Sequence, residues 1–205
     1  MSRKTEVSTL KTDPRVRHTR GALGDALLTL MQEKPFETIT VQQVLDHAGI
    51  GRSTFYAHYR DKDDLFLSDL EDFFEPMSTL LLRCREASNR VAPVRELFAH
   101  VAEMRHLHAA LITADKLRDF LEMGLEYFAR AIEQRLSELP SSCAIAPAQR
   151  VAMAHAFAGA LLSLMSWWVD HGGSASPEEM DNLYHQMVWS GITARTAATE
   201  PIPVT

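Results

Sequence analysis

Residues Thr40 to Tyr59, TVQQVLDHAGIGRSTFYAHY, constrain the fold of this chain more than any other stretch. A threonine followed three residues later by a glutamine is a capping box, so we expect a helix to begin at Thr40. Gly49 supplies the left-handed residue that ends this helix, because glycine has no Cβ to clash. A second short helix then begins at Gly51 or Arg52 and runs to about Tyr59. The stretch predicts two short helices joined by a tight turn, which is a helix-turn-helix.

The exposed face of the second helix has the composition of a surface that contacts DNA. With Phe55 and Tyr59 assigned to the core, the remaining side chains include a guanidinium, two hydroxyls, a phenol and an imidazole. No acidic residue lies between Ala48 and Arg60, and acidic residues would repel phosphates. The second helix of such a motif enters the major groove and reads base edges. A merely solvated polar helix is the alternative interpretation.

The segment from Val16 to Phe66 resembles the DNA-binding head of the TetR family of bacterial transcriptional regulators. The resemblance rests on an amphipathic first helix and on motifs that follow it in the family's order: Lys34-Pro35-Phe36, Ile39-Thr40-Val41, Ala48-Gly49-Ile50, Thr54-Phe55-Tyr56, His58-Tyr59, Lys62 and Leu65. The family usually has Phe at the position of Tyr59, a conservative departure. The resemblance implies an all-α fold, with an N-terminal three-helix helix-turn-helix head and a larger C-terminal helical domain for ligand binding and dimerisation.

The resemblance also assigns roles at the DNA, residue by residue. Base edges are expected to face Gln42, Arg52, Ser53 and Tyr56. Phosphates are expected to contact Arg17, Arg20, Thr40, Thr54, His58 and Lys62. Arg52 can read guanine through its bidentate fork.

Charge is distributed unevenly along the chain. The net charge of −6 argues against a nucleic-acid partner until its distribution is considered. Residues 1–62 carry ten Lys and Arg against seven Asp and Glu, whereas the remainder carries eleven against twenty. The basic excess lies in the N-terminal arm and the start of the first helix, at Arg3, Lys4, Lys11, Arg15, Arg17 and Arg20. Attraction to phosphate is therefore local to the amino end.

The compartment follows from cysteine usage and hydropathy. Cys84 and Cys143 are the only cysteines and form no motif, which indicates a reducing cytoplasm, with a thiol sensor as the alternative. No run of about eighteen uninterrupted apolar residues occurs, so we expect no membrane partner. Val151 to Val169 comes nearest and is interpreted as a buried helix.

The chain is expected to divide into four parts. Residues 1–12 form a flexible basic arm, 13–62 the DNA-binding head, 63–195 the C-terminal domain and 196–205 a loose tail. Helices are expected from Pro14 with a stripe of Leu23, Ala26, Leu27, Leu30 and Met31, and then over about 62–81, 93–113, 115–139, 147–170 and 177–195. Residues 140–147 form a loop. Pro76 predicts either a kink near Asp72 or a break into two helices.

The last two helices have the composition of a dimer interface. Small residues at helical spacing allow another helix to approach closely, and the helix from 147 is apolar nearly all round. The predicted interface consists of Ala152, Ala156, Gly159, Ala160, Ser163, Tyr184, Met187 and Gly191. A symmetric homodimer would place two reading helices about 34–36 Å apart on a palindromic operator. A helix buried at the centre of a monomer is the alternative.

Large adaptable side chains between these elements predict a pocket for a small hydrophobic inducer. The candidates are Phe73, Phe74, Met77, Met104, His108, Phe120, Met123, Tyr127, Phe128 and Trp168, with Met165 also on these helices, and an ordinary core is the alternative for each. No cofactor and no catalytic motif is expected. The predicted function is a repressor whose operator binding responds to this ligand. A metal sensor using His100, His106 and His108, a redox-responsive regulator, or a helical adaptor without DNA reading are the alternatives.

Overall fold

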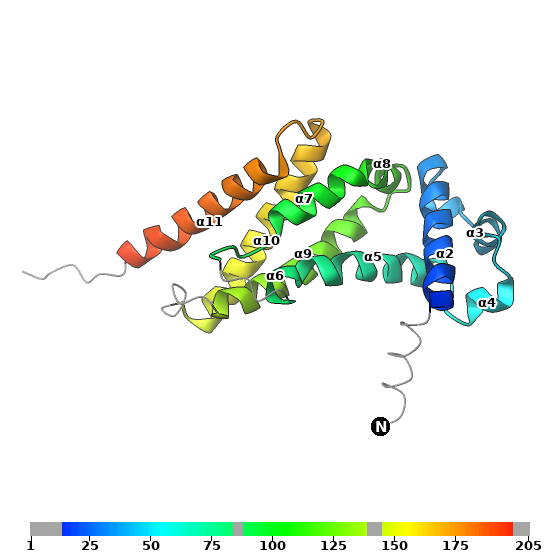
Figure 1. Cartoon of the computed structure of the whole chain (residues 1–205), viewed down its shortest axis with the longest axis horizontal. Coiled ribbons are helices and arrows are strands. Elements are labelled where there is room, and N and C mark those ends of the chain that lie inside the picture. The colour runs from blue at the N-terminus through cyan, green and yellow to red at the C-terminus, as the bar shows by residue number, and fades with distance from the viewer. Residues whose placement is uncertain (1–13, 84–87, 139–144, 199–205) are drawn as a thin grey trace, which may run out of the picture. The chain divides into compact units, whose positions relative to one another are not determined.

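The computed structural model describes residues 14–83, 88–138 and 145–198, except for the side chains of Arg105 and residues 191–198 (Figure 1). Every regular element in these ranges is helical, which confirms the predicted all-α class. The elements are α2 (Pro14–Glu33), η1 (Phe36–Thr38), α3 (Val41–Ala48), α4 (Arg52–Tyr56), α5 (Lys62–Ser78), α6 (Leu80–Arg83), α7 (Val94–Glu103), α8 (Arg105–Thr113), α9 (Leu117–Glu138), α10 (Pro147–Asp170) and α11 (Pro177–Ala198). The predicted N-terminal arm, the loop after Glu138 and most of the C-terminal tail lie outside the described residues.

The chain divides into two compact units. The first contains the described residues up to Asp72 together with His106–Phe120. The second contains Phe73–Arg105 and the chain from Leu121 onward. Helices α5 and α9 each contribute residues to both units. The domain limits predicted from the sequence remain predictions, because a compact unit is not in itself a domain that folds alone.

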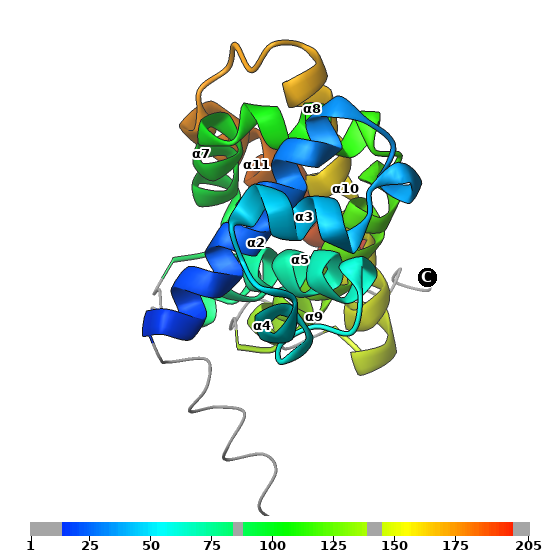
Figure 2. The same ribbon diagram turned by 90° about the vertical axis from the view of Figure 1, so that its right-hand side faces the viewer.

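The first unit has a core built on α2. The buried residues of α2 are the five predicted for its apolar stripe, and α2 packs against α3 (Figure 2). Phe36 is fully buried, and its backbone N–H donates to the carbonyl of Ala114 over 3.1 Å. The amine of Lys116 lies 4.5 Å from the centre of the Phe36 ring. The segment that follows α8 therefore completes the core of the head from a distant part of the sequence.

The predicted single helix over 93–113 is wrong, because the structure has two helices there. Met104 separates α7 from α8 with φ −107° and ψ 36°, outside the helical region. Its N–H donates to the carbonyls of both His100 and Val101, as is common where a helix ends. No Pro or Gly marks this break, so local propensity gave no signal of it.

Of the two alternatives for Pro76, the structure shows a break into two helices. Pro76 lies in the last turn of α5, and α6 begins two residues after α5 ends, at Leu80. Thr79 bridges the two helices, since its N–H donates to the Glu75 carbonyl and its own carbonyl accepts from the Arg83 N–H. The chain therefore passes Pro76 in helical conformation and ends the helix beyond it.

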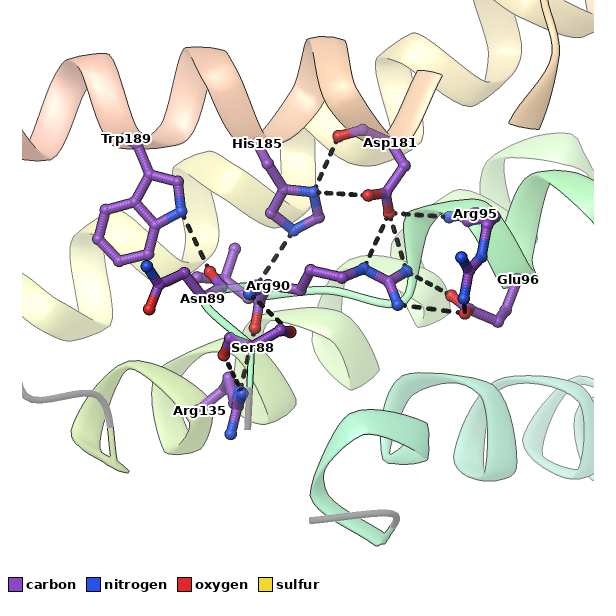
Figure 3. Close-up of polar contacts among 10 residues, drawn as sticks. Ser88, Asn89, Arg90, Arg95, Glu96, Arg135, Asp181, His185 and Trp189 are labelled. Atoms are coloured by element: carbon purple, nitrogen blue, oxygen red, sulfur yellow. Dashed lines mark hydrogen bonds and ion pairs between the residues drawn. The ribbon is translucent and has the colours of Figure 1, made fainter. Parts of the chain in front are cut away.

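A polar network in the second unit fastens the segment before α7 to α11 (Figure 3). The guanidinium of Arg90 donates to Asp181 on α11 over 2.8 Å and to Glu96 on α7 over 3.1 Å. His185 accepts from the backbone N–H of Val91 through Nε2. Burial alone would raise the pKa of Asp181, but hydrogen bonds and charge from His185 and Arg90 lower it to about 2.

The same segment is held to α9 from its other side. Arg135 is buried, and its guanidinium donates to the backbone carbonyls of Ser88 and Arg90 over 2.6 and 3.0 Å. On the α11 side, the indole of Trp189 donates to the carbonyl of Asn89 (Figure 3). These bonds satisfy an irregular backbone that would otherwise leave polar groups buried without partners.

Candidate nucleic-acid interface

The helix-turn-helix forms for the local reasons expected from the sequence. The Thr40 hydroxyl accepts from the N–H of Gln43 over 3.3 Å, and the Gln43 side chain accepts from the N–H of Thr40 over 3.0 Å. Gly49 has φ 65° and ends α3 in the left-handed conformation. Gly51 precedes α4 at its N-cap. The capping box and the glycine turn are confirmed.

The second helix of the motif is shorter than expected. α4 ends at Tyr56 rather than near Tyr59, and the N–H groups of His58 and Tyr59 both donate to the carbonyl of Phe55. Phe55 is fully buried and Tyr59 nearly so, and their ring centres are 5.6 Å apart. The assignment of both rings to the core is confirmed, and this core fixes the direction of α4.

The outward face of α4 is polar and free of acidic groups, and α4 contacts α3. Arg52, Ser53 and Thr54 are exposed, and Tyr56 is 51% exposed although it is aromatic. An exposed tyrosine flanked by a guanidinium and hydroxyls offers both apolar contact and hydrogen bonds to a base edge. The structure thus brings three of the four predicted base readers onto one short helix.

The fourth predicted base reader, Gln42, lies on α3 and is hydrogen-bonded to the first residue of α4. Its Oε1 accepts from Nη2 of Arg52 over 2.8 Å. Its Nε2 donates to the carboxylate of Asp46, one turn later on α3, over 2.7 Å. All three residues are exposed. The sequence analysis did not predict a role for Asp46, although its spacing of four residues from Gln42 could have suggested one.

The candidate phosphate contacts fall into different environments. Arg17, Thr40 and Thr54 are exposed, and His58 is half-buried. The amine of Lys62 donates to the carbonyl of Phe36 over 2.7 Å and lies 4.5 Å from the Phe36 ring centre. Lys62 therefore ties the start of α5 to the core of the head, and its contact with DNA remains a prediction.

Arg20, which was predicted to contact phosphate, is paired within the head, and its contact with DNA remains a prediction. Its Nη2 donates to the hydroxyl of Ser68 and to the carboxylate of Asp72, each over 2.6 Å, and its side chain is 19% exposed. The guanidinium therefore ties α2 to α5 through two side chains. The partners are about fifty residues away in sequence, and no local pattern connects them.

A partly buried carboxylate, that of Asp69, lies beside this pair. An ideal Cβ built on Gly24 of α2 would lie 2.7 Å from Oδ2 of Asp69 on α5, so the glycine leaves room for this carboxylate. Burial, together with repulsion from Asp72 and Asp25, raises the pKa of Asp69 to about 7, although the charge of Arg20 opposes the shift. A cavity of about 390 Å³ in the head is lined by Arg17, Arg20, Gly21, Asp69 and Asp72.

The residues predicted to line a ligand pocket are spread over both compact units. Phe120 and His108 belong to the first unit, and the other candidates to the second. Phe74, Phe128 and Trp168 are core residues; the first two rings pack edge to face at 6.0 Å, and the indole of Trp168 donates to the carbonyl of Ala175. The predicted pocket therefore stays a prediction.

The second unit has a cavity that the sequence analysis did not predict. It measures about 450 Å³ and lies between α9 and α10, lined by Leu121, Glu122, Leu125, Gly159, Leu162, Ser163 and Ser166. None of the ten predicted pocket residues lines it. The Ser166 hydroxyl is buried and has no hydrogen-bond partner among the described residues. An apolar cavity with one unsatisfied hydroxyl suits a small, mainly apolar molecule.

α10 presents an uncovered face, as the predicted dimer interface requires. Ala152, Ala156, Ala160 and Ser163 are exposed and Gly159 is half-buried. Among the described residues of α10 and α11, four large apolar side chains are also exposed: Val151, Trp167, Leu183 and Met187. The sequence analysis predicted Met187 but not Val151, Trp167 or Leu183. Their exposure can be recognised only when the buried face of each helix is known.

Tyr184 was wrongly assigned to the dimer interface. Its side chain is fully buried within its own subunit, and its hydroxyl donates to the carbonyl of Phe157 over 3.0 Å. Burial raises the pKa of this phenol far above its usual value. Gly191 belongs to the part of α11 for which only the backbone is described, so its place in the interface stays a prediction.

By length and composition, α10 alone among the described helices could cross a membrane. Only one side of it is buried, at Ala154, Ala158, Leu161, Leu162, Met165 and Trp168, so the expectation of a fully buried helix holds for one face. The core helix of a globular protein has the same apolar length. Within the described part of the chain, no group of three His, Cys, Asp or Glu side chains is placed to hold a metal ion. Cys84 and Cys143 lie outside the described residues.

Two family models match this chain. Residues 23–68 match the model described as "Bacterial regulatory proteins, tetR family", and residues 93–189 match that described as "Transcriptional regulator C-terminal region". A curated relative, the uncharacterized HTH-type transcriptional regulator YxbF of Bacillus subtilis (strain 168), is 21% identical over 178 residues. That match covers 83% of this chain but 44% of the relative, so the chain spans less than half of the relative's length.

Solved structures share the fold. A TetR transcriptional regulator from Streptococcus agalactiae 2603V is 22% identical with a TM-score of 0.59, over 88% of this chain and 98% of that chain. The dihydroxyacetone kinase operon activator DhaS is 16% identical with a TM-score of 0.60, over 86% and 97%. The two family models together span most of the sequence, and their helix-turn-helix is present in the structure. The chain therefore belongs to the TetR family of bacterial transcriptional regulators.

Proposed function

We propose that this protein is a cytoplasmic homodimer that represses transcription by binding a palindromic operator with two α4 helices, and that a small hydrophobic ligand releases it. The observation that carries the proposal is the exposed polar face of α4 beside Gln42, held in place by the buried rings of the head. A regulator that reads DNA needs such a face, whereas a helical adaptor does not. No catalytic activity is part of the proposal.

The dimer half of the proposal is supported by the uncovered side of α10. Small residues allow the helices of two subunits to approach, and Trp167 and Met187 supply large apolar groups that are 52% and 47% exposed. Large apolar side chains that lie together in one exposed patch mark an interface, and we propose that these side chains form such a patch. A twofold interface would use the same patch on both copies.

For the DNA, we propose that Gln42, Arg52, Ser53 and Tyr56 contact bases. Arg17, Arg20, Thr40, Thr54, His58 and Lys62 are proposed for phosphates, and Arg20 would have to exchange its bond to Asp72 for a phosphate. Thr40 and Thr54 begin or lie in helices whose N-terminal N–H groups favour anions. Phosphate contacts set the register, and base contacts set the sequence preference.

For regulation, we propose that ligand in the second unit shifts the population of DNA-competent heads. α5 carries Lys62 in the first unit and Phe74 in the second. We propose that a change in the packing around Phe74 shifts the position of the helix start at Lys62. The cavity lined by Ser166 is a further candidate, because it offers space and an unsatisfied hydroxyl. It shares Gly159 and Ser163 with the proposed dimer face, so a ligand there would lie at the edge of that face. Repression rather than activation is the family's usual mode, although DhaS is named as an activator.

Selection of genomic fragments from the source organism by the purified chain tests this function. We expect one palindromic sequence to be enriched and to be bound at salt near 0.1 M, with random duplex bound more weakly. Enrichment of no sequence over random DNA would contradict the proposed reading, and the genes beside an enriched site would suggest the class of ligand.

A further inference from the structure

Three exposed side chains on the two helices of the motif form a chain of hydrogen bonds. The carboxylate of Asp46 accepts from Nε2 of Gln42 over 2.7 Å, and Oε1 of Gln42 accepts from Nη2 of Arg52 over 2.8 Å. Asp46 and Gln42 are four residues apart on α3, so they share one face of that helix. Arg52 is the first residue of α4. The chain of bonds therefore connects the two helices of the motif on their exposed side.

The direction of these bonds is fixed by chemistry rather than by the fit of the amide alone. An ionised carboxylate has only acceptors, so Asp46 requires the NH₂ end of Gln42. The oxygen of the amide must then face Arg52, whose guanidinium has only donors. With the amide turned over, oxygen would face oxygen at Asp46 and donor would face donor at Arg52. Asp46 and Arg52 therefore favour the same amide orientation, and the bond from Asp46 adds to the stability of the Gln42 side chain in that orientation.

We propose that Asp46 is a positioning residue for base reading, which holds Gln42 and, through it, the Arg52 guanidinium in the orientation that reads guanine. This inference rests on the proposed function, because it concerns how the same site discriminates between bases. Arg52 uses one of its five N–H donors on Gln42, so the others remain for the O6 and N7 atoms of a guanine. Holding the fork in place before binding removes part of the cost of ordering a long side chain on the DNA.

Asp46 also has an effect of opposite sign on binding without sequence preference. It is an exposed negative charge on the helix beside the reading helix, so it repels phosphates whichever bases are present. Removing the carboxylate should therefore strengthen binding to random duplex while it weakens discrimination. A residue that mattered only for folding would weaken both when it is replaced.

The test compares variants of the full chain on the selected operator and on random duplex. Arg52→Ala first identifies the base pair that Arg52 reads, as the position where preference is lost. At that pair, Asp46→Ala should reduce the preference for guanine by about two- to tenfold, the usual range for one exposed hydrogen bond, and should increase affinity for random duplex. Asp46→Asn keeps an oxygen acceptor for Gln42 but removes the charge, so it should restore the preference and keep the increased random affinity.

Glu37→Ala is the matched control, because it removes an exposed carboxylate from the same head outside the bonded chain. It should leave the preference at the Arg52 position unchanged. Thermal unfolding of each variant establishes that the heads are folded. Full guanine preference in Asp46→Ala, or equal losses on operator and random duplex, would overturn the positioning role while leaving the proposed function intact. A wild-type chain without preference for any duplex would overturn both.

Discussion

Replacing the partly buried carboxylate of Asp69 should make the head more stable at neutral and alkaline pH. Burial is the largest cause that raises the pKa of Asp69 from 3.8 to about 7, and repulsion from Asp72 adds to it. Its side chain packs against Gly24 and makes no hydrogen bond among the described residues that would stabilise the charged form. The ionised carboxylate is therefore a destabilising group in the folded state.

The sign and the size of this effect on the free energy of unfolding follow from proton linkage. Because the folded protein holds this proton more tightly than the unfolded chain, Asp69 contributes stability that is fully present below pH 3.8 and is lost as the pH rises through about 7. Each pH unit in this window changes the free energy of unfolding by about 1.4 kcal/mol, so the total is about 4 kcal/mol. This is an upper limit, since α2 and α5 can relax around the charge.

The assay is urea unfolding of wild type and Asp69→Asn from pH 5 to 8.5. Other titrating groups contribute equally to both proteins, so the difference in unfolding free energy isolates Asp69. We expect the variant to gain stability over wild type as the pH rises to about 7, and the gain to level off above it. The Asp69 carboxyl carbon should titrate in the same range by NMR. If the unfolding free energies of the two proteins differed by the same amount at every pH, or if Asp69 titrated near pH 4, the reasoning would be refuted.

Three further predictions concern packing, assembly and reading. Gly21→Ala, with no atom within 4 Å of its Cβ, should raise the free energy of unfolding by up to about 1 kcal/mol in urea unfolding. Gly24→Ala should stabilise less, because its Cβ would lie 2.7 Å from a carboxylate oxygen and force the Asp69 side chain to shift, and an equal gain from both would contradict this contact. Ala160→Glu on the exposed face of α10 should convert a dimer to monomers by sedimentation, and an unchanged mass would exclude this face. Arg52→Ala should cost about 1–3 kcal/mol on the operator and little on random duplex, whereas Lys62→Ala should weaken both and also lower the unfolding midpoint, because its amine holds the Phe36 carbonyl; equal effects of Arg52→Ala on both duplexes would contradict its role.

The helix-turn-helix could be predicted because its signals are local. The capping box at Thr40, the left-handed Gly49 and the buried Phe55 each depend on residues within a few positions of one another. Such features follow from backbone sterics and helix geometry alone. The apolar stripe of α2 was predictable for the same reason, since its spacing shows which face is buried.

The rest depends on contacts between residues distant in sequence. The pairing of Arg20 with Asp72 and the packing of Asp69 on Gly24 become visible only when α2 and α5 are placed together. Tyr184 has the periodicity of either a core or an interface residue, and only the carbonyl of Phe157 distinguishes them. A periodic pattern identifies an apolar face but does not identify what covers it.

The most direct test of the account is the stoichiometry and spacing of the complex with the selected operator. Sedimentation at low salt should show two chains on one duplex. Inserting about five base pairs between the half-sites should abolish tight binding, and inserting a full turn of about ten should partly restore it, because the half-sites then face the same side again. A single chain per duplex with affinity independent of the spacing would contradict a paired reading of DNA.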